Sequence, residues 1–175
     1  QGIARVIGVG LLLFSGLIMA TSGTFVVKPG FRGIEVTMGR VSPDFKPEGF
    51  GFKLPFVTRI APMLIRQQTS KMTVDCYSSD LQQVKMSVRL LYRVPEASVV
   101  KIFQEYAGEP FDNLIAPRVM EALKEVAATQ SAEQIVKRRE EIKSRALELA
   151  RRKIGAQFLD VTDLVIYNLA LSNEL

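Results

Sequence analysis

The sequence predicts an α+β fold that follows a single membrane-spanning helix, and three observations lead to this prediction. The chain opens with a long run of residues without a charge. Apolar residues then recur with period two up to residue 94, and with helical spacing from residue 95 onward. We therefore expect a transmembrane anchor at residues 1–27, a sheet-rich half at 28–94 and a helix-rich half at 95–175.

The uncharged run extends from Val6 to Val27 and is flanked by Arg5 and Lys28. A helix of this length is about 33 Å long, enough to cross a hydrocarbon core of about 30 Å. Basic residues at both ends suit the two membrane surfaces. The predicted span consists of apolar and small residues, among them Val6, Leu12, Phe14, Gly16, Ala20 and Val27. A stripe of small residues recurs every four positions at Gly16, Ala20 and Thr24, and helices can approach closely along it.

Two other interpretations of this run remain. A secretory signal peptide would be cut near Ala20-Thr21-Ser22, but the apolar stretch continues past that point through Phe25, Val26 and Val27. A buried core helix is the other interpretation, although the run has no polar face. The run contains no proline, which favours one straight span over a hairpin that re-enters the membrane. The sequence leaves the orientation of the span open.

The half from residue 28 to 94 has the alternation of antiparallel strands. Residues 33–38 are expected to form a strand with Ile34, Val36 and Met38 on one face. The clearest strand covers residues 84–92, where the apolar residues on one face are Val84, Met86, Val88, Leu90 and Tyr92. Such alternation is typical of a sheet with one solvated face.

A stretch rich in Pro, Gly and Phe at residues 42–56 lies between these strands. It contains four of the ten phenylalanines, namely Phe45, Phe50, Phe52 and Phe56. One interpretation is a loop whose aromatic rings cap the core of the sheet. The other is that some of these rings contact the bilayer surface, since Lys28 holds the domain next to the membrane.

The half from residue 95 to 175 is expected to be mainly helical. One helix follows Pro95, and a second begins near Asp112 with Pro117 tolerated in its first turn. Ser131 and Gln134 have the spacing of a capping box that starts a helix ending near Ile154. A final strand is predicted at residues 165–171, with alternating Val165, Tyr167, Leu169 and Leu171.

Residues 137–153 of this helix carry eight basic and three acidic residues, a surplus of +5 that equals the formal net charge of the whole chain. We expect no nucleic-acid binding, because the segment has no aromatic residue for stacking and its basic residues surround the helix. The alternatives are a solvated helix face, or a surface that binds an acidic neighbouring subunit or anionic lipid. The candidate oligomer-interface residues are Arg138, Arg139, Arg145, Arg151 and Arg152.

The composition excludes much enzymology. The chain has no His, no Trp and one Cys, so a His base, a Ser-His-Asp triad and a Cys/His zinc site are excluded. We predict no catalytic, cofactor-binding or metal-binding residue and no small-molecule substrate. A Ser/Lys hydrolase built on Ser70-Lys71, or on Ser87 near Lys85, is a weak alternative. Cys76 is expected to be a small, half-buried and unreactive residue.

Several of these segments, taken together, resemble the SPFH (band 7) superfamily and its prohibitin-like members in particular. The resemblance covers nearly all of residues 24–172 in the same order. It is carried by residues 27–34 (VKPGFRGI), 47–56 (PEGFGFKLPF), 80–94 (DLQQVKMSVRLLYRV), 114–117 (LIAP), 137–142 (KRREEI) and 159–164 (LDVTDL).

This resemblance implies an SPFH domain behind one transmembrane helix, in a protein that acts as a scaffold rather than an enzyme. Such proteins form large membrane-bound homo-oligomers, rings or domes of many copies, that organise lipids and membrane proteins and modulate AAA+ membrane proteases. It also implies a C-terminal coiled coil starting near Ser172, and a single-pass protein of a bacterial inner membrane or a related organelle membrane. The alternative is a stomatin-like regulatory subunit that binds a membrane protease or channel directly, without forming a ring.

Overall fold

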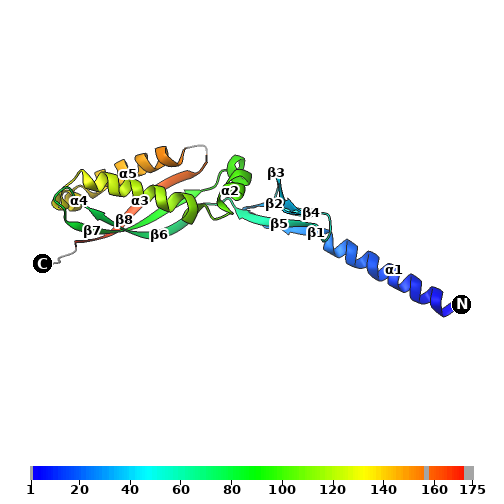
Figure 1. Cartoon of the computed structure of the whole chain (residues 1–175). Helices are drawn as coiled ribbons and strands as arrows, with labels where there is room; N and C mark the ends of the chain where they lie inside the picture. Colours follow the sequence, from blue (N-terminus) through cyan, green and yellow to red (C-terminus); the bar gives the residue numbers. More distant parts are fainter. Residues whose placement is uncertain (1, 156–157, 172–175) are drawn as a thin grey trace. The chain divides into compact units, whose positions relative to one another are not determined.

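The computed structural model describes residues 2–155 and 158–171 and confirms the α+β class (Figure 1). The chain divides into two compact units, Gln1–Leu64 and Ile65–Leu175. This boundary lies about 30 residues before the predicted one at residue 94, because the strands at 68–93 fold together with the helices that follow them. The predicted coiled-coil start at Ser172 lies outside the described residues.

The first unit begins with helix α1, Gly2–Ser22, which is shorter than the predicted span. The structure corrects the placement of Val27, which is not in the helix but buried in strand β1, Thr24–Val27. Thr24 is likewise outside the helix, so the stripe of small residues ends at Ala20. Three of the four β1 residues are β-branched and suit a strand, but composition alone could not reveal their pairing with residues 49–52.

Strand β1 pairs with β4, Gly49–Phe52, and a separate antiparallel sheet has the order β3-β2-β5. Its strands are β2 (Phe31–Thr37), β3 (Arg40–Lys46) and β5 (Thr58–Leu64). The stretch expected to be a loop at residues 42–56 therefore contributes to two strands. Pro43 is tolerated because β3 is an edge strand, where a missing N–H breaks no ladder.

The structure confirms a strand around Ile34, which is fully buried, but corrects the position of Met38. Met38 and Gly39 form the turn between β2 and β3 with positive φ angles of 49° and 82°. Positive φ at both central residues is the signature of the tight type I′ hairpin turn. Met38 is therefore exposed, because the strand ends at Thr37 and its side-chain alternation ends there too.

The second unit is built on an antiparallel sheet of order β6-β7-β8. The strands are β6 (Gln68–Tyr77), β7 (Gln83–Arg93) and β8 (Asp160–Leu171). The alternation predicted for the central strand is confirmed, since the five apolar residues from Val84 to Tyr92 are all buried. Each such side chain stabilises the fold by about 1.5–3 kcal/mol relative to exposure.

Strand β8 differs from its prediction in length and in facing. It begins at Asp160, and its buried residues are Val161, Leu164 and Ile166, whereas Val165 and Tyr167 are exposed. The pairing of β7 with β8 contains two register shifts, between Ser87 and Val88 and between Leu91 and Tyr92. Such bulges change which residues face the core, so strict alternation could not assign the faces.

The helices of the second unit follow the predicted order, and two of them, at Ala116–Ala128 and Arg139–Ile154, pack against its sheet (Figure 1). They are α2 (Val99–Tyr106), α3 (Ala116–Ala128), α4 (Ala132–Lys137) and α5 (Arg139–Ile154), with a 3-10 turn at Glu96–Ser98 and a π-helical turn at Phe111–Ile115. The capping box of Ser131 and Gln134 and the first-turn position of Pro117 are confirmed. The predicted long helix is interrupted at Arg138, whose ψ of 34° separates α4 from α5.

Candidate membrane-contact and assembly surfaces

Helix α1 exposes apolar side chains on all sides between Val6 and Met19. Its residues Arg5–Ser22 are long and apolar enough to cross a membrane, and none of that segment is buried against the rest of the chain. This exposure contradicts the interpretation as a buried core helix. Leu12 is 74% exposed and Phe14 is 62% exposed, a costly arrangement in water that lipid or another apolar surface would relieve.

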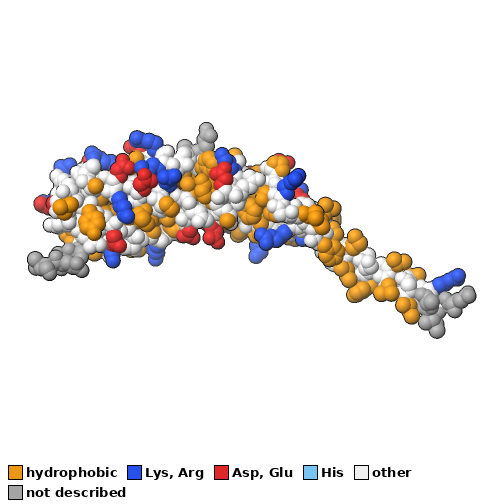
Figure 2. Space-filling view, in the orientation of Figure 1, with side chains coloured by type: hydrophobic (Ala, Val, Ile, Leu, Met, Phe, Trp, Pro, Cys, Tyr) orange, Lys and Arg blue, Asp and Glu red, His pale blue; other side chains and the backbone are white. Residues whose placement is uncertain are grey.

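Exposed apolar side chains continue from the end of α1 onto the strands and turns beside it, as Figure 2 shows. We call this surface the aromatic patch. It consists of Val26, Met38, Phe50, Phe52, Leu54, Phe56 and Val57. The three phenylalanines were predicted as membrane-contact residues, and each is at least 66% exposed.

Local hydrogen bonds hold the parts of the aromatic patch together. The Lys53 N–H donates to the Gly23 carbonyl at the end of α1 (2.8 Å), and the Met38 N–H donates to the Val57 carbonyl (3.0 Å). Val26 lies opposite Phe50 in the β1–β4 pair. The patch therefore joins three segments to the C-terminal end of the apolar helix.

Gly51 explains why Phe50 and Phe52 face outward. The ring of Phe25 occupies the space that a Gly51 Cβ would need, with its Cζ atom only 2.5 Å from that position. Side chains alternate along a strand, so Phe50 and Phe52 point to the opposite face. There their rings meet edge to face, with centroids 5.1 Å apart.

The fourth predicted phenylalanine, Phe45, is not part of the aromatic patch. It is only half-exposed in β3, where it pairs with the buried Ile34. For this residue the structure supports the interpretation that the ring covers the core of the sheet. The sequence prediction placed Val26 in the membrane span rather than in a strand, and it missed Met38, Leu54 and Val57. Of these three only Leu54 carried a signal, because it lies within the Phe-rich stretch.

The unit that carries the aromatic patch has a net positive charge. Residues 1–64 contain seven basic and three acidic residues, a net charge of +4, whereas residues 65–175 carry only +1. Two of the three acids are already paired, because Lys46 lies 3.0 Å from Glu35 and Arg32 lies 3.4 Å from Glu48. Exposed Lys28 suits contact with anionic head groups beside an apolar surface.

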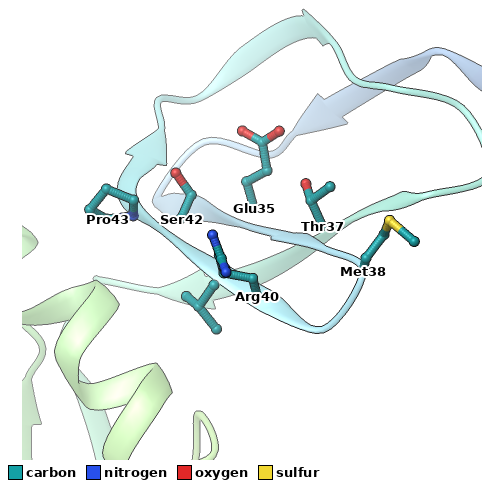
Figure 3. A pocket seen from close by; sticks show the side chains of 7 residues that line it. Glu35, Thr37, Met38, Arg40, Ser42 and Pro43 are labelled. Atoms are coloured by element: carbon teal, nitrogen blue, oxygen red, sulfur yellow. The ribbon is translucent and has the colours of Figure 1, made fainter.

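A shallow hollow of about 560 Å³ runs along the β2–β3 hairpin (Figure 3). It is lined by Glu35, Thr37, Met38, Arg40, Val41, Ser42 and Pro43. Its Met38 end belongs to the aromatic patch. Because it is open and its acid is ion-paired with Lys46, the hollow resembles a surface for polar groups beside the patch more than an enclosed catalytic site.

The predicted basic helix largely pairs its charges within the second unit. Arg145 and Arg138 both bind Glu141, at 2.6 Å and 3.8 Å, and Arg152 binds Glu148 at 3.1 Å. Two of these pairs, Glu141–Arg145 and Glu148–Arg152, join residues four positions apart on the helix. For Arg139, which is exposed, no ion pair is recorded with any described residue.

Arg151 has a role within its own chain. Its Nε donates to the Val161 carbonyl (2.7 Å) and its Nη2 donates to the Thr162 carbonyl (2.8 Å). These bonds fix the start of β8 against α5. Arg151 is therefore a structural residue, and an interface on α5 is left with Arg138, Arg139, Arg145 and Arg152.

Lys153 also acts within the unit by joining α5 to α3. It lies 2.7 Å from Glu121 and 3.1 Å from Glu125. Hydrogen bonding to Glu121 raises the pKa of Lys153, and the same bond lowers the pKa of Glu121. Both groups are therefore charged at neutral pH.

Cys76 is more deeply buried than predicted, with 1% of its surface exposed. Burial raises the pKa of its thiol to about 11, although the positive charge of Lys124 opposes this shift. We expect less than a tenth of the Cys76 thiols in the folded chain to react with maleimide at pH 8 while denatured chain reacts fully, because the thiolate is the nucleophile. Rapid labelling of folded protein would contradict this packing.

The family model described as "SPFH domain / Band 7 family" matches residues 25–175. The chain belongs to this family. The match begins three residues after α1 ends, so the SPFH domain and the apolar helix are consecutive segments. Among the residues that the structure describes, no group of His, Cys, Asp or Glu side chains gathers to hold a metal ion.

Curated relatives of this SPFH protein carry the name prohibitin. Prohibitin-2 of Schizosaccharomyces pombe is 29% identical over 154 residues, which cover 86% of this chain and 53% of that protein. Prohibitin 1 of Gallus gallus is 27% identical over 95% of this chain and 61% of its own length. "Prohibitin-1, mitochondrial" of Arabidopsis thaliana is 25% identical over 98% of this chain and 60% of its own length. The chain thus spans a little over half the length of these relatives.

Proposed function

We propose that this SPFH protein is a non-enzymatic membrane scaffold. Helix α1 spans the bilayer, the aromatic patch lies in the head-group region, and many copies assemble side by side into a ring or dome. The observation that carries the proposal is the continuity of an exposed apolar helix with an exposed aromatic patch. Exposure of either apolar surface to water is unfavourable in free energy, and one lipid bilayer would bury both.

In this proposal the scaffold functions through the assembly of many copies. A ring of anchored copies would enclose an area of membrane, organise the lipids and proteins within it, and limit the access of an AAA+ membrane protease to them. One of the relatives is named "Mitochondrial prohibitin complex protein 1" (Caenorhabditis elegans, 28% identical over 170 residues), and its name refers to a complex. We place this chain in the inner membrane of a bacterium or in a mitochondrial membrane, as a single-pass protein.

A closed ring needs contacts in which one face of a copy meets a different face of the next. The exposed face of α5 with Arg139, Arg145 and Arg152, together with Arg138 immediately before the helix, is our candidate for one of these faces. Changing all four residues to Glu should reduce the particle mass of the detergent-solubilised chain at least twofold, measured by size-exclusion chromatography with light scattering. The effect should shrink in high salt, because these charges are exposed.

The matched control reverses four other basic residues of the second unit, Arg66, Arg93, Arg118 and Lys124, which are also exposed. It changes the net charge equally and should leave the mass unaltered. An unchanged mass in the α5 variant would show that α5 is only a solvated surface. A wild-type chain that is a single copy in detergent would favour the alternative of a regulatory subunit that binds a protease or channel directly.

A further inference from the structure

The edge strands of this protein differ in how they are protected from pairing with other strands. An edge strand exposes unpaired backbone groups, and proteins commonly block it with proline, bulges or charges. In the first unit both edges of the β3-β2-β5 sheet contain a proline, Pro43 in β3 and Pro62 in β5. In the second unit, β8 has two register shifts, and Arg151 occupies two of its carbonyls.

Strand β6 is the exception among the long edge strands of the described residues. It extends over ten residues without proline and pairs with β7 residue by residue, with no register shift. For Thr69–Tyr77 no backbone hydrogen bond is recorded with any described segment other than β7. Its open edge is therefore long, regular and suited to accept a further strand.

The side chains of β6 are arranged symmetrically about Thr73. The exposed residues alternate in the order Thr69, Lys71, Thr73, Asp75 and Tyr77. Lys71 and Asp75 stand two residues on either side of Thr73, with opposite charges. An antiparallel copy of the same strand that pairs Thr73 with Thr73 would place Lys71 of each copy opposite Asp75 of the other.

We infer that β6 is a self-pairing edge, at which two copies of this chain join their sheets antiparallel about a two-fold axis at Thr73. Two cross-strand Lys–Asp pairs and a central Thr–Thr pair are favourable neighbours in such a ladder. Lys85 lies 3.7 Å from Asp75 within each chain, so each carboxylate would stand between two ammonium groups. The half-exposed Met72 would meet Val74 of the second copy and lose contact with water.

The charges also select the register. Pairing Lys71 with Lys71 or Asp75 with Asp75 would bring like charges together, which is unfavourable in a ladder. A slip by one residue would place exposed side chains of one copy beside core-facing side chains of the other. This two-fold contact joins copies in pairs, so it is additional to the ring contacts proposed above, and it needs neither α5 nor the bilayer.

Disulfide trapping in the full-length chain tests this register. Starting from a Cys76→Ala background, Thr73→Cys should cross-link to a dimer under mild oxidation, since the two Cα atoms would lie about 4.5–5.5 Å apart. Lys71→Cys alone is the matched control, because two residues at position 71 would be some 13 Å apart, and it should remain monomeric on a non-reducing gel. A mixture of Lys71→Cys with Asp75→Cys should cross-link.

A charge swap provides a second test that needs no cysteine. Lys71→Asp should weaken dimerisation on the order of tenfold, because two attractive pairs become repulsive, and the double variant Lys71→Asp/Asp75→Lys should restore it. Failure of folded Thr73→Cys protein to cross-link would overturn the inference, as would cross-linking of Thr73→Cys to a cysteine placed at Val165 in β8. Either result would leave membrane anchoring intact, whereas carbonate extraction of the wild-type chain would contradict the proposed function and not this contact.

Discussion

Replacing Leu12 and Phe14 with arginine is expected to remove the chain from the membrane. These residues lie near the middle of the apolar segment Arg5–Ser22. An arginine at the centre of a spanning helix costs about 2.5–3.5 kcal/mol on insertion scales. The two substitutions together therefore disfavour insertion by roughly 6 kcal/mol, and the protein should move from the carbonate-resistant pellet to the soluble or aggregated fraction.

The matched control for this experiment is Leu12→Ala together with Phe14→Leu, which keeps the segment apolar. This variant should stay in the pellet with the wild-type chain. If the double arginine variant also stays in the pellet, α1 does not span the bilayer, and another surface of the protein must hold it there.

Changing Phe50 and Phe52 to serine is expected to weaken lipid binding without weakening the fold. In a chain limited to residues 24–175, binding to liposomes depends on the aromatic patch rather than on α1. Removing a phenylalanine from an apolar contact costs about 1.5 kcal/mol at the lower end of the usual range, so the double variant should bind on the order of 100-fold more weakly. Its melting temperature should change little, because both rings are exposed.

Tyr77→Ser together with Leu81→Ser is the corresponding control, since both are exposed apolar side chains outside the aromatic patch. It should leave liposome binding unchanged. A large fall in melting temperature for the Phe50/Phe52 variant would instead mark these rings as part of the core. Equal losses of binding in the two variants would show that exposed apolar residues anywhere on the chain bind liposomes nonspecifically, and that the aromatic patch is not a specific lipid-contact surface.

The parts of the fold that the sequence predicted correctly depend on signals between neighbours in the chain. The alternation in β7, the capping box at Ser131 and the uncharged run of α1 are all of this kind. A local signal succeeds where the element has one uniform environment along its length. Strand β7 is such a case, because it lies in the middle of its sheet with one face against the helices.

The candidate membrane surface was predicted only in part, for a related reason. The composition of residues 42–56 pointed to the bilayer, but it could not separate Phe50, Phe52 and Phe56 from Phe45. The outward orientation of Phe50 and Phe52 accompanies the packing of the Phe25 ring against Gly51. This contact joins two residues that are distant in sequence. Likewise Met38 joins the aromatic patch because a hairpin turn brings it to Val57.

By itself, then, the sequence determined that this protein has an apolar helix, an alternating sheet and capped helices, because local spacing and charge are sufficient for these. Only the tertiary structure decided that Val27 leaves the helix for a strand, that β8 reverses its faces, and that Arg151 serves its own chain. Each of these depends on a partner distant in sequence. The free energy of such a pairing depends on both partners, so neither segment predicts it alone.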